Sequence, residues 1–130
     1  MKKNENRTHG FLQELFPDVE IEHPYYIKEK IYDENNNLIR NYILVDFGIM
    51  VNGKQVLVEY NGSQHFRSVK KWGGRAALFK QKIRDKFLRD YCKINKIKLV
   101  EIDGRRVRGQ RILSELKKRL RTIIKKAPTK

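Results

Sequence analysis

Apolar residues along this chain recur first at helical spacing and then at strand spacing. Near the amino terminus, Asn6 or Thr8 caps a predicted short helix that Pro17 ends. The buried stripe of this helix consists of four apolar residues: Phe11, Leu12, Leu15 and Phe16. The next segment, Val19–Ile31, contains four apolar or aromatic residues that Pro24 interrupts: Ile21, Tyr25, Tyr26 and Ile27. Because proline removes a donor from the ladder, this segment predicts an edge strand.

The middle of the chain contains the clearest pattern. A turn cluster at Asp33–Asn37 precedes the stretch NYILVDFGIMVNGKQVLVEYNG. Two apolar runs in this stretch flank Asn52-Gly53, a dipeptide that favours the positive backbone angles of a tight hairpin. The sequence therefore predicts two antiparallel strands joined at Asn52-Gly53.

The second half of the chain predicts a helix, a strand and a helix. The stretch 63–74 has no period, and a long helix over 75–95 follows it, with an apolar stripe that must cover a sheet: Phe79, Ile83, Phe87 and Tyr91. Ile97–Ile102 is a short apolar strand that ends at Asp103-Gly104. The last helix, 110–125, directs five apolar residues inward: Ile112, Leu113, Leu116, Leu120 and Ile123.

These elements predict an α/β (α+β) fold in one domain over residues 1–130. Their order is helix, three strands, helix, strand and helix, without an internal repeat. A strand reached through a crossover helix tends to lie parallel to an earlier strand, so we expect a central mixed sheet flanked by helices. We expect residues 1–7 and 126–130 to be flexible tails.

The net charge of the chain limits the classes of function that it suits. The chain has 30 Lys and Arg against 15 Asp and Glu, a net charge of +15. Such an excess repels itself in a compact state, and nucleic acid is the commonest polyanion that neutralises it. The single cysteine, Cys92, excludes an intrachain disulfide and a multi-cysteine zinc site. No apolar run of membrane-spanning length occurs, so we expect a cytoplasmic protein without a membrane partner.

Two carboxylates stand out in the hairpin. Asp46 interrupts the apolar run Tyr42–Val45, and Glu59 ends the run Val56–Val58. Acids on adjacent strands can converge on a hard divalent cation, which activates water and neutralises charge during phosphodiester cleavage. As a bare pair, they are more readily interpreted as solvated surface charges beside lysines.

The surrounding residues resemble a known superfamily. VDF at Val45–Phe47 and VEYNGSQHF at Val58–Phe66 are similar to motifs of the PD-(D/E)xK nucleases, in particular the compact phage and intron homing-endonuclease branch related to very-short-patch repair endonucleases. WGG at Trp72–Gly74, Asp85, DYCKINKIKLVEI at Asp90–Ile102 and the closing helix follow in the same order. The resemblance covers roughly residues 42–124 and implies a restriction-endonuclease-like fold.

The resemblance also implies roles for individual residues. Asp46 and Glu59 would be metal ligands, with the backbone carbonyl of Tyr60 as a third, and the cofactor would be Mg²⁺ or Mn²⁺. The substrate would be DNA, double-stranded DNA in the first place, in the cytosol of a bacterium or of a phage-infected host. The site would thus be that of a metal-dependent DNA endonuclease.

One position departs from the family pattern. Asn61 occupies the place of the motif lysine, and an amide supplies no positive charge to the attacking water or the phosphate. Either Gln64 and His65 take over orientation and proton transfer, or a lysine such as Lys86 reaches in from elsewhere. Taken alone, His65 is more readily interpreted as a structural histidine, whereas beside Glu59 and Gln64 the structural and the catalytic interpretation stand equal. Loss of activity is a further alternative.

Two acids outside the hairpin remain open as accessory residues. Glu14 matches the acid that the superfamily often supplies from its first helix, or else is a solvated charge, and Glu5 competes with it. Asp85 lies away from the apolar stripe of its helix, so an ion pair with Arg89 or Lys82 is the first expectation and a metal or substrate contact the second.

Basic residues cluster in the loops near the predicted catalytic end. We expect them to bind phosphates along DNA, with Trp72 either stacking on a base or packing locally: Lys70, Lys71, Trp72, Arg75, Arg105, Arg106 and Arg108. The alternative function is a catalytically silent DNA- or RNA-binding module with the same fold. A structural RNA-binding protein of ribosomal type would explain the charge but not Asp46 or Glu59. One active site suits nicking, and a double-strand break would need a homodimer or two binding events.

Overall fold

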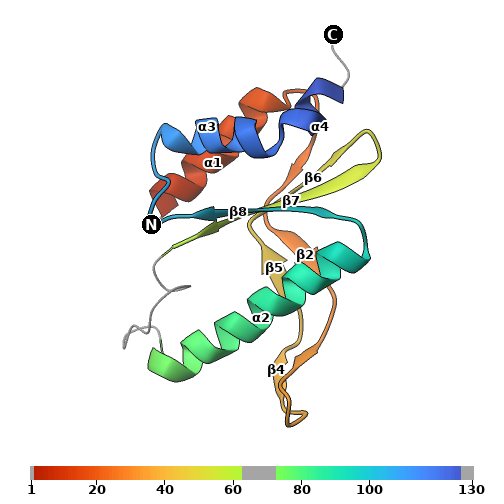
Figure 1. Ribbon diagram of the computed structural model, residues 1–130, viewed down its shortest axis with the longest axis vertical. Coiled ribbons are helices and arrows are strands. Elements are labelled where there is room, and N and C mark those ends of the chain that lie inside the picture. Colours follow the sequence, from red (N-terminus) through yellow and green to blue (C-terminus); the bar gives the residue numbers. More distant parts are fainter. Residues whose placement is uncertain (1, 63–72, 127–130) are drawn as a thin grey trace.

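The computed structural model describes residues 2–62 and 73–126, and Figure 1 shows their arrangement. The elements in chain order are α1 (Lys2–Leu15), β1 (Ile21–Glu22), β2 (Tyr25–Ile27), β3 (Ile31–Tyr32), β4 (Leu38–Arg40), β5 (Ile43–Val45), β6 (Phe47–Val51), β7 (Lys54–Asn61), α2 (Gly74–Ile94), β8 (Lys98–Asp103), α3 (Arg111–Arg119) and α4 (Arg121–Lys126).

A four-stranded mixed sheet organises the molecule, in the order β1-β6-β7-β8. β6 and β7 form the predicted hairpin, whereas β7 and β8 run parallel from Val56↔Lys98 to Asn61↔Asp103. Helices α1, α3 and α4 lie over one face of the sheet, and α2 lies over the other (Figure 1). The predicted α/β class and mixed sheet are therefore confirmed. The carboxyl ends of β7 and β8 meet at one edge.

The central strand β7 divides the core into two parts. Val56 and Val58 belong to the cluster packed against α1 and α3, whereas Leu57 belongs to the cluster packed against α2. All three side chains have no exposed surface, as expected for a strand covered on both faces. Because side chains alternate along a strand, Glu59 continues the face of Leu57, which is the α2 side.

The predicted single strand after residue 42 is in fact two strands. β5 pairs with β2, whereas β6 pairs with β1 and β7, so the chain changes sheets at Asp46. The partner segment divides at the same level, between β1 and β2, where Pro24 lies. The predicted edge strand over 19–31 consequently becomes three short strands. Buried and more exposed residues alternate without a break from Ile43 through Asp46 to Phe47. This alternation is the same as in a continuous strand, so the corner leaves no sign in the sequence pattern.

The amino-terminal segment is helical where the sequence predicted a tail, and the predicted last helix is interrupted. The expected amino-terminal tail is helical from Lys2, and within it Thr8 is fully buried and donates to the carbonyl of Asn4. The Asn4 side chain in turn accepts the N–H of Gly109 at 3.2 Å. The expected last helix divides into α3 and α4 at Leu120, whose φ of −109° breaks the helical repeat. Residues 127–130 of the expected carboxyl-terminal tail lie outside the described residues.

Helix α2 lies within a residue of its predicted bounds but rotates its buried face. Phe79, the first residue of the predicted stripe, is 54% exposed. The residues that α2 buries are Arg84, Asp85, Leu88 and Cys92. The other three stripe residues are partly buried along the margin of this face: Ile83, Phe87 and Tyr91.

The packing of β2 against β6 predicts the effect of a single methyl group. A Cβ on Gly48 would overlap the ring of Tyr25, whereas a Cβ on Gly10 meets no atom within 4 Å. We expect Gly48→Ala to lower the free energy of unfolding by about 1–3 kcal/mol through overpacking. Gly10→Ala, in the middle of α1, should raise it by about 0.5–1 kcal/mol. Urea unfolding measures both, and a neutral Gly48→Ala would refute the close approach of Tyr25.

Candidate functional site

The corner between β5 and β6 turns Asp46 towards the central strand. Its Oδ2 accepts the backbone N–H of Tyr60 at 2.7 Å. Its own carbonyl oxygen lies 2.7 Å from Nδ1 of His23, whose ring stacks on Phe47. Asp46 is therefore fixed from two sides, by β7 through its side chain and by the segment between β1 and β2 through its backbone.

The carboxyl group of Asp46 lies in an unusual electrostatic environment. Desolvation by burial raises its pKa to about 7, and the N–H of Tyr60 offsets only part of this. The negative charges of Glu59 and Glu5 raise the pKa further. The two predicted carboxylates are thus close enough to interact. Glu5 of α1 is a third acid in this region, and its Oε2 lies 3.7 Å from Nε2 of His23.

Glu59 is held by a buried arginine that the sequence analysis missed. Arg84 of α2 donates from Nη1 to Oε1 and from Nη2 to Oε2 of Glu59, both at 2.7 Å. Nη1 also contacts Asp85 at 3.0 Å, and Nη2 donates to the carbonyl of Leu44 at 2.6 Å. The side chains of Arg84 and Glu59 are 7% and 6% exposed. Burial acts to lower the pKa of Arg84, but Glu59 and Asp85 outweigh it and raise the pKa.

Asn61 carries an unsatisfied oxygen. The residue is 5% exposed, and its Oδ1 has no hydrogen-bond partner among the residues that the structure describes. Its backbone carbonyl accepts the N–H of Gly104 at 2.7 Å, which fixes the end of β7 against β8. A buried acceptor without a donor costs about 1–3 kcal/mol, so such oxygens commonly face a donor or a cation.

The end of β7 carries oxygen atoms of the types that hard divalent cations prefer. Asp46 offers a carboxylate, and Asn61 offers the unpaired amide oxygen. In a strand the N–H and the C=O of one residue point to the same side. The N–H of Tyr60 points to Asp46, so its carbonyl also points to the side of β7 on which Asp46 lies. Within residues 2–62 and 73–126, no cluster of three or more His, Cys, Asp or Glu side chains suits a metal ion. Because Arg84 contacts both oxygens of Glu59, Glu59 could bind an ion only by sharing its carboxylate between Arg84 and that ion.

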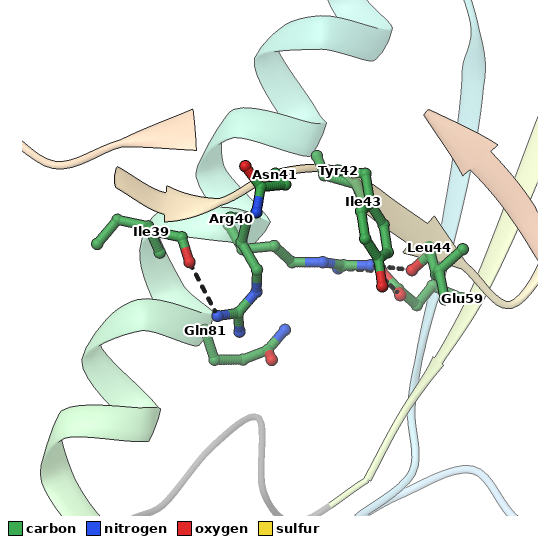
Figure 2. Close-up of a pocket in the computed structure, with 9 residues that line it drawn as sticks. Ile39, Arg40, Asn41, Tyr42, Ile43, Leu44, Glu59 and Gln81 are labelled. Carbon is green, nitrogen blue, oxygen red and sulfur yellow. Dashed lines mark hydrogen bonds and ion pairs between the residues drawn. The ribbon is translucent and has the colours of Figure 1, made fainter. Parts of the chain in front are cut away.

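A cavity opens beside the Glu59–Arg84 ion pair. It has a volume of about 470 Å³ and lies between residues 39–44 and Gln81 of α2. Figure 2 shows Arg40 and Gln81 on one side of it and Tyr42, Ile43 and Leu44 along the neighbouring strand. The buried ion pair forms part of its wall, so a ligand in the cavity would reach Glu59.

The other predicted acids and the alternative lysine occupy different places. Lys86 donates to Asp90 at 2.8 Å and its side chain is 77% exposed, so it pairs along the helix surface and not with Glu59. Glu14 is exposed on α1. Asp85 is buried, and it contacts Arg84 as well as Gln81, whose Nε2 donates to it at 2.9 Å.

The expected surface ion pair of Asp85 is corrected by these contacts. Its described ion pair is with Arg84, in place of Arg89 or Lys82. Arg89 instead makes two hydrogen bonds to Glu101 of β8, at 2.8 and 3.0 Å. The rotated face of α2 explains the difference, because it turns Asp85 inward with Arg84.

The arginines after β8 lie at the same edge of the sheet as Asn61. Tyr60 donates its hydroxyl to the carbonyl of Val107 at 3.1 Å, which ties this loop to the end of β7. Arg105 hydrogen-bonds Asp103, and with Arg106 it lowers the pKa of that carboxyl. Arg106 is 82% exposed. The remaining predicted contacts divide between Arg75, exposed at the start of α2, and residues outside the described part of the chain: Gln64, His65, Lys70, Lys71 and Trp72.

Comparisons with known proteins leave the family open, since no family model, no curated protein and no solved structure matches this chain. In the described part of the chain, no helix has both the length and the apolar character needed to cross a membrane.

The helical spacing of Arg84 from two apolar residues indicates that it is buried. It stands four residues before Leu88 and eight before Cys92, which places it on the same helical face as two buried residues. The neighbouring stripe that begins at Phe79 was predicted as the buried face, so Arg84 was not predicted to be buried. His23 carried no comparable signal, because its contacts with Asp46 and Phe47 depend on the corner between the sheets.

The raised pKa of Asp46 predicts a specific pH dependence of stability. The ordinary pKa is 3.8, so between pH 3.8 and about pH 7 the folded state holds a proton that the unfolded state releases. Stability should therefore fall as the pH rises through this window and then level off, by on the order of 4 kcal/mol. Asp46→Asn removes the titrating group and should abolish this part of the slope. Urea unfolding across the window tests this, and parallel pH profiles of the two proteins would contradict it.

The buried ion pair predicts a large loss on truncation. Arg84→Met leaves Glu59 and Asp85 without their cation in the interior and should lower the free energy of unfolding by about 3–5 kcal/mol. Arg89→Met is the matched control, because Arg89 makes a similar forked contact with Glu101 at the surface and should cost no more than about 1 kcal/mol. Equal losses in the two variants, measured by chemical denaturation, would show that burial of Arg84 has no energetic weight.

Proposed function

We propose that this protein is a divalent-metal-dependent DNA endonuclease that hydrolyses phosphodiester bonds. The observation that carries the proposal is the carboxyl group of Asp46, desolvated and next to the charge of Glu59, at the edge of the sheet where an arginine-rich loop lies. A carboxyl group with a perturbed pKa beside a second charge is typical of catalytic sites. A structural role alone gives no reason to retain such an unfavourable group.

Three oxygen ligands are proposed for Mg²⁺ or Mn²⁺: the carboxylates of Asp46 and Glu59 and the backbone carbonyl of Tyr60. When bound, the ion supplies an activated water and stabilises charge on the phosphate. Asp46 would hold its ligand oxygen in place through the N–H of Tyr60. A divalent charge beside Asp46 would lower its pKa and so oppose the effect of burial and of the neighbouring acids.

Arg84 is proposed to supply the positive charge that Asn61 lacks. Its guanidinium contacts both oxygens of Glu59, and it remains protonated at any pH at which the fold exists. Held by Asp85 and by the carbonyl of Leu44, it keeps this charge fixed beside the candidate metal ligands. Asn61, Gln64 and His65 would then orient water or transfer a proton. This assignment replaces Lys86 as the source of charge.

DNA binding is proposed for the basic edge of the sheet. Arg105, Arg106 and Arg108 follow β8 directly, and Arg75 begins α2. The net charge of +15 supports a polyanionic substrate. Lys70, Lys71 and Trp72 are proposed contacts from their sequence position.

One observation favours a second candidate function. Both carboxylate oxygens of Glu59 are already engaged by Arg84, and a pair closed in this way resists ligation of a cation. A catalytically silent module that binds DNA or RNA would retain this pair as a structural feature.

A plasmid assay distinguishes the two functions. Wild type in Mg²⁺ or Mn²⁺ should convert supercoiled plasmid to relaxed or linear product, and EDTA should stop the reaction. Asp46→Asn should lower the rate by at least about 100-fold, because the loss of a metal ligand removes several kcal/mol of transition-state stabilisation. Asp18→Asn, the same change at an exposed residue after α1, is the matched control and should leave the rate unchanged.

The products and the bound fraction complete this test. Relaxed circles alone would indicate nicking by a monomer, whereas linear molecules would indicate paired active sites, as in a homodimer. Binding of the plasmid by both proteins without cleavage by either would refute the endonuclease and favour the silent module.

A further inference from the structure

One face of the β2–β5 ribbon is open and aromatic. Ile27, Ile43 and Val45 pack towards α2 in the core. Because side chains alternate, the intervening residues lie on the opposite face. They are large and exposed: Tyr26 is 48% exposed, Tyr42 44% and Leu44 45%. Tyr26 and Leu44 are register partners, so these side chains form one surface, which we call the tyrosine face.

The two rings on the tyrosine face are neighbours and carry a cation beside them. The ring centroids of Tyr26 and Tyr42 lie 5.1 Å apart with a tilt of 41°. Nζ of Lys28 lies 5.9 Å from the centre of the Tyr26 ring. An exposed aromatic pair next to a lysine is the composition of surfaces on which successive nucleobases stack while a cation contacts the backbone phosphate.

The tyrosine face is continuous with the candidate active site. The carbonyl of Leu44 accepts a hydrogen bond from Arg84, the same guanidinium that holds Glu59. Asp46 follows Leu44 by two residues, which is roughly 7 Å along an extended chain. Arg40 and Tyr42 border the cavity beside the ion pair (Figure 2). A strand laid on this face would therefore reach the candidate ligands within about one nucleotide.

We infer that the tyrosine face binds a single-stranded segment of DNA, with unpaired bases stacked on Tyr26 and Tyr42 and phosphates near Lys28 and Arg40. The inference rests on the proposed function for the choice of DNA as the polyanion. A duplex hides the faces of its bases inside the stack, so only an unpaired strand can use both rings. The preferred substrate would then be DNA whose strand is unpaired beside the scissile phosphate.

Binding without cleavage tests this inference independently of catalysis. Fluorescence anisotropy in EDTA would compare a labelled oligothymidylate of about 15 nucleotides, a duplex of equal length and an abasic strand with the same number of phosphates. The test variant is Tyr26→Ala/Tyr42→Ala, and Tyr26→Phe/Tyr42→Phe retains the rings. Tyr32→Ala is the matched control, because Tyr32 is equally exposed, at 48%, but lies on β3.

The inference predicts a different affinity for each combination of variant and ligand. The alanine variant should bind the oligothymidylate roughly 5- to 100-fold more weakly for each ring removed, whereas the phenylalanine variant and Tyr32→Ala should bind as wild type does. Wild type should bind the abasic strand as weakly as the alanine variant binds the oligothymidylate. Equal affinity of wild type for abasic and intact strands, or unchanged binding by the alanine variant with its melting temperature preserved, would overturn it.

The two proposals fail in different assays. A wild type that binds through its tyrosines but cleaves neither plasmid nor DNA with an unpaired strand would refute the endonuclease and retain the tyrosine face. A wild type that cleaves in metal, with binding insensitive to both tyrosines, would refute the tyrosine face alone.

Discussion

The ion pair of Glu59 and Arg84 is the interaction on which the arrangement of this molecule depends. It joins the central strand β7 to α2, and through the carbonyl of Leu44 it also holds the β2–β5 ribbon. A buried charge pair is a poor source of net stability, because desolvation offsets most of its attraction. The forked contact restricts the placement of α2 against β7, and this placement brings a positive charge beside the carboxylates of Glu59 and Asp85.

The carboxyl group of Asp46 lies in a different environment from that of Glu59. It is partly buried and makes no described ion pair, and the charge of Arg84 offsets only part of the effect of desolvation. The change of sheets at this residue produces the effect, because β5 and β6 separate and leave the side chain directed at β7. Strained or desolvated groups of this kind are usual where a protein trades stability for reactivity.

The sequence predicted those features that depend on local pattern. The hairpin at Asn52-Gly53, the helix before β8 and the mixed sheet follow from turn chemistry and apolar spacing, and the acids Asp46 and Glu59 were distinguishable as interruptions of apolar runs. The corner at Asp46 and the partner of Glu59 were not predictable in this way. Both depend on contacts across the fold, and an alternating pattern is the same whether a strand continues or bends into a second sheet. The comparison of Arg84 with Leu88 and Cys92 shows how a buried charge can be overlooked on a basic helix.

The hydrogen bond from Gly109 to the side chain of Asn4 has a practical meaning for protein engineering. It places the first turn of α1 against the arginine loop, and Figure 1 shows the amino terminus beside the end of β8. Any fusion partner or purification handle joined before Lys2 would emerge at the edge of the sheet where the candidate site lies. The end of α4 lies well away from that edge in the same view, and it offers the safer point of attachment.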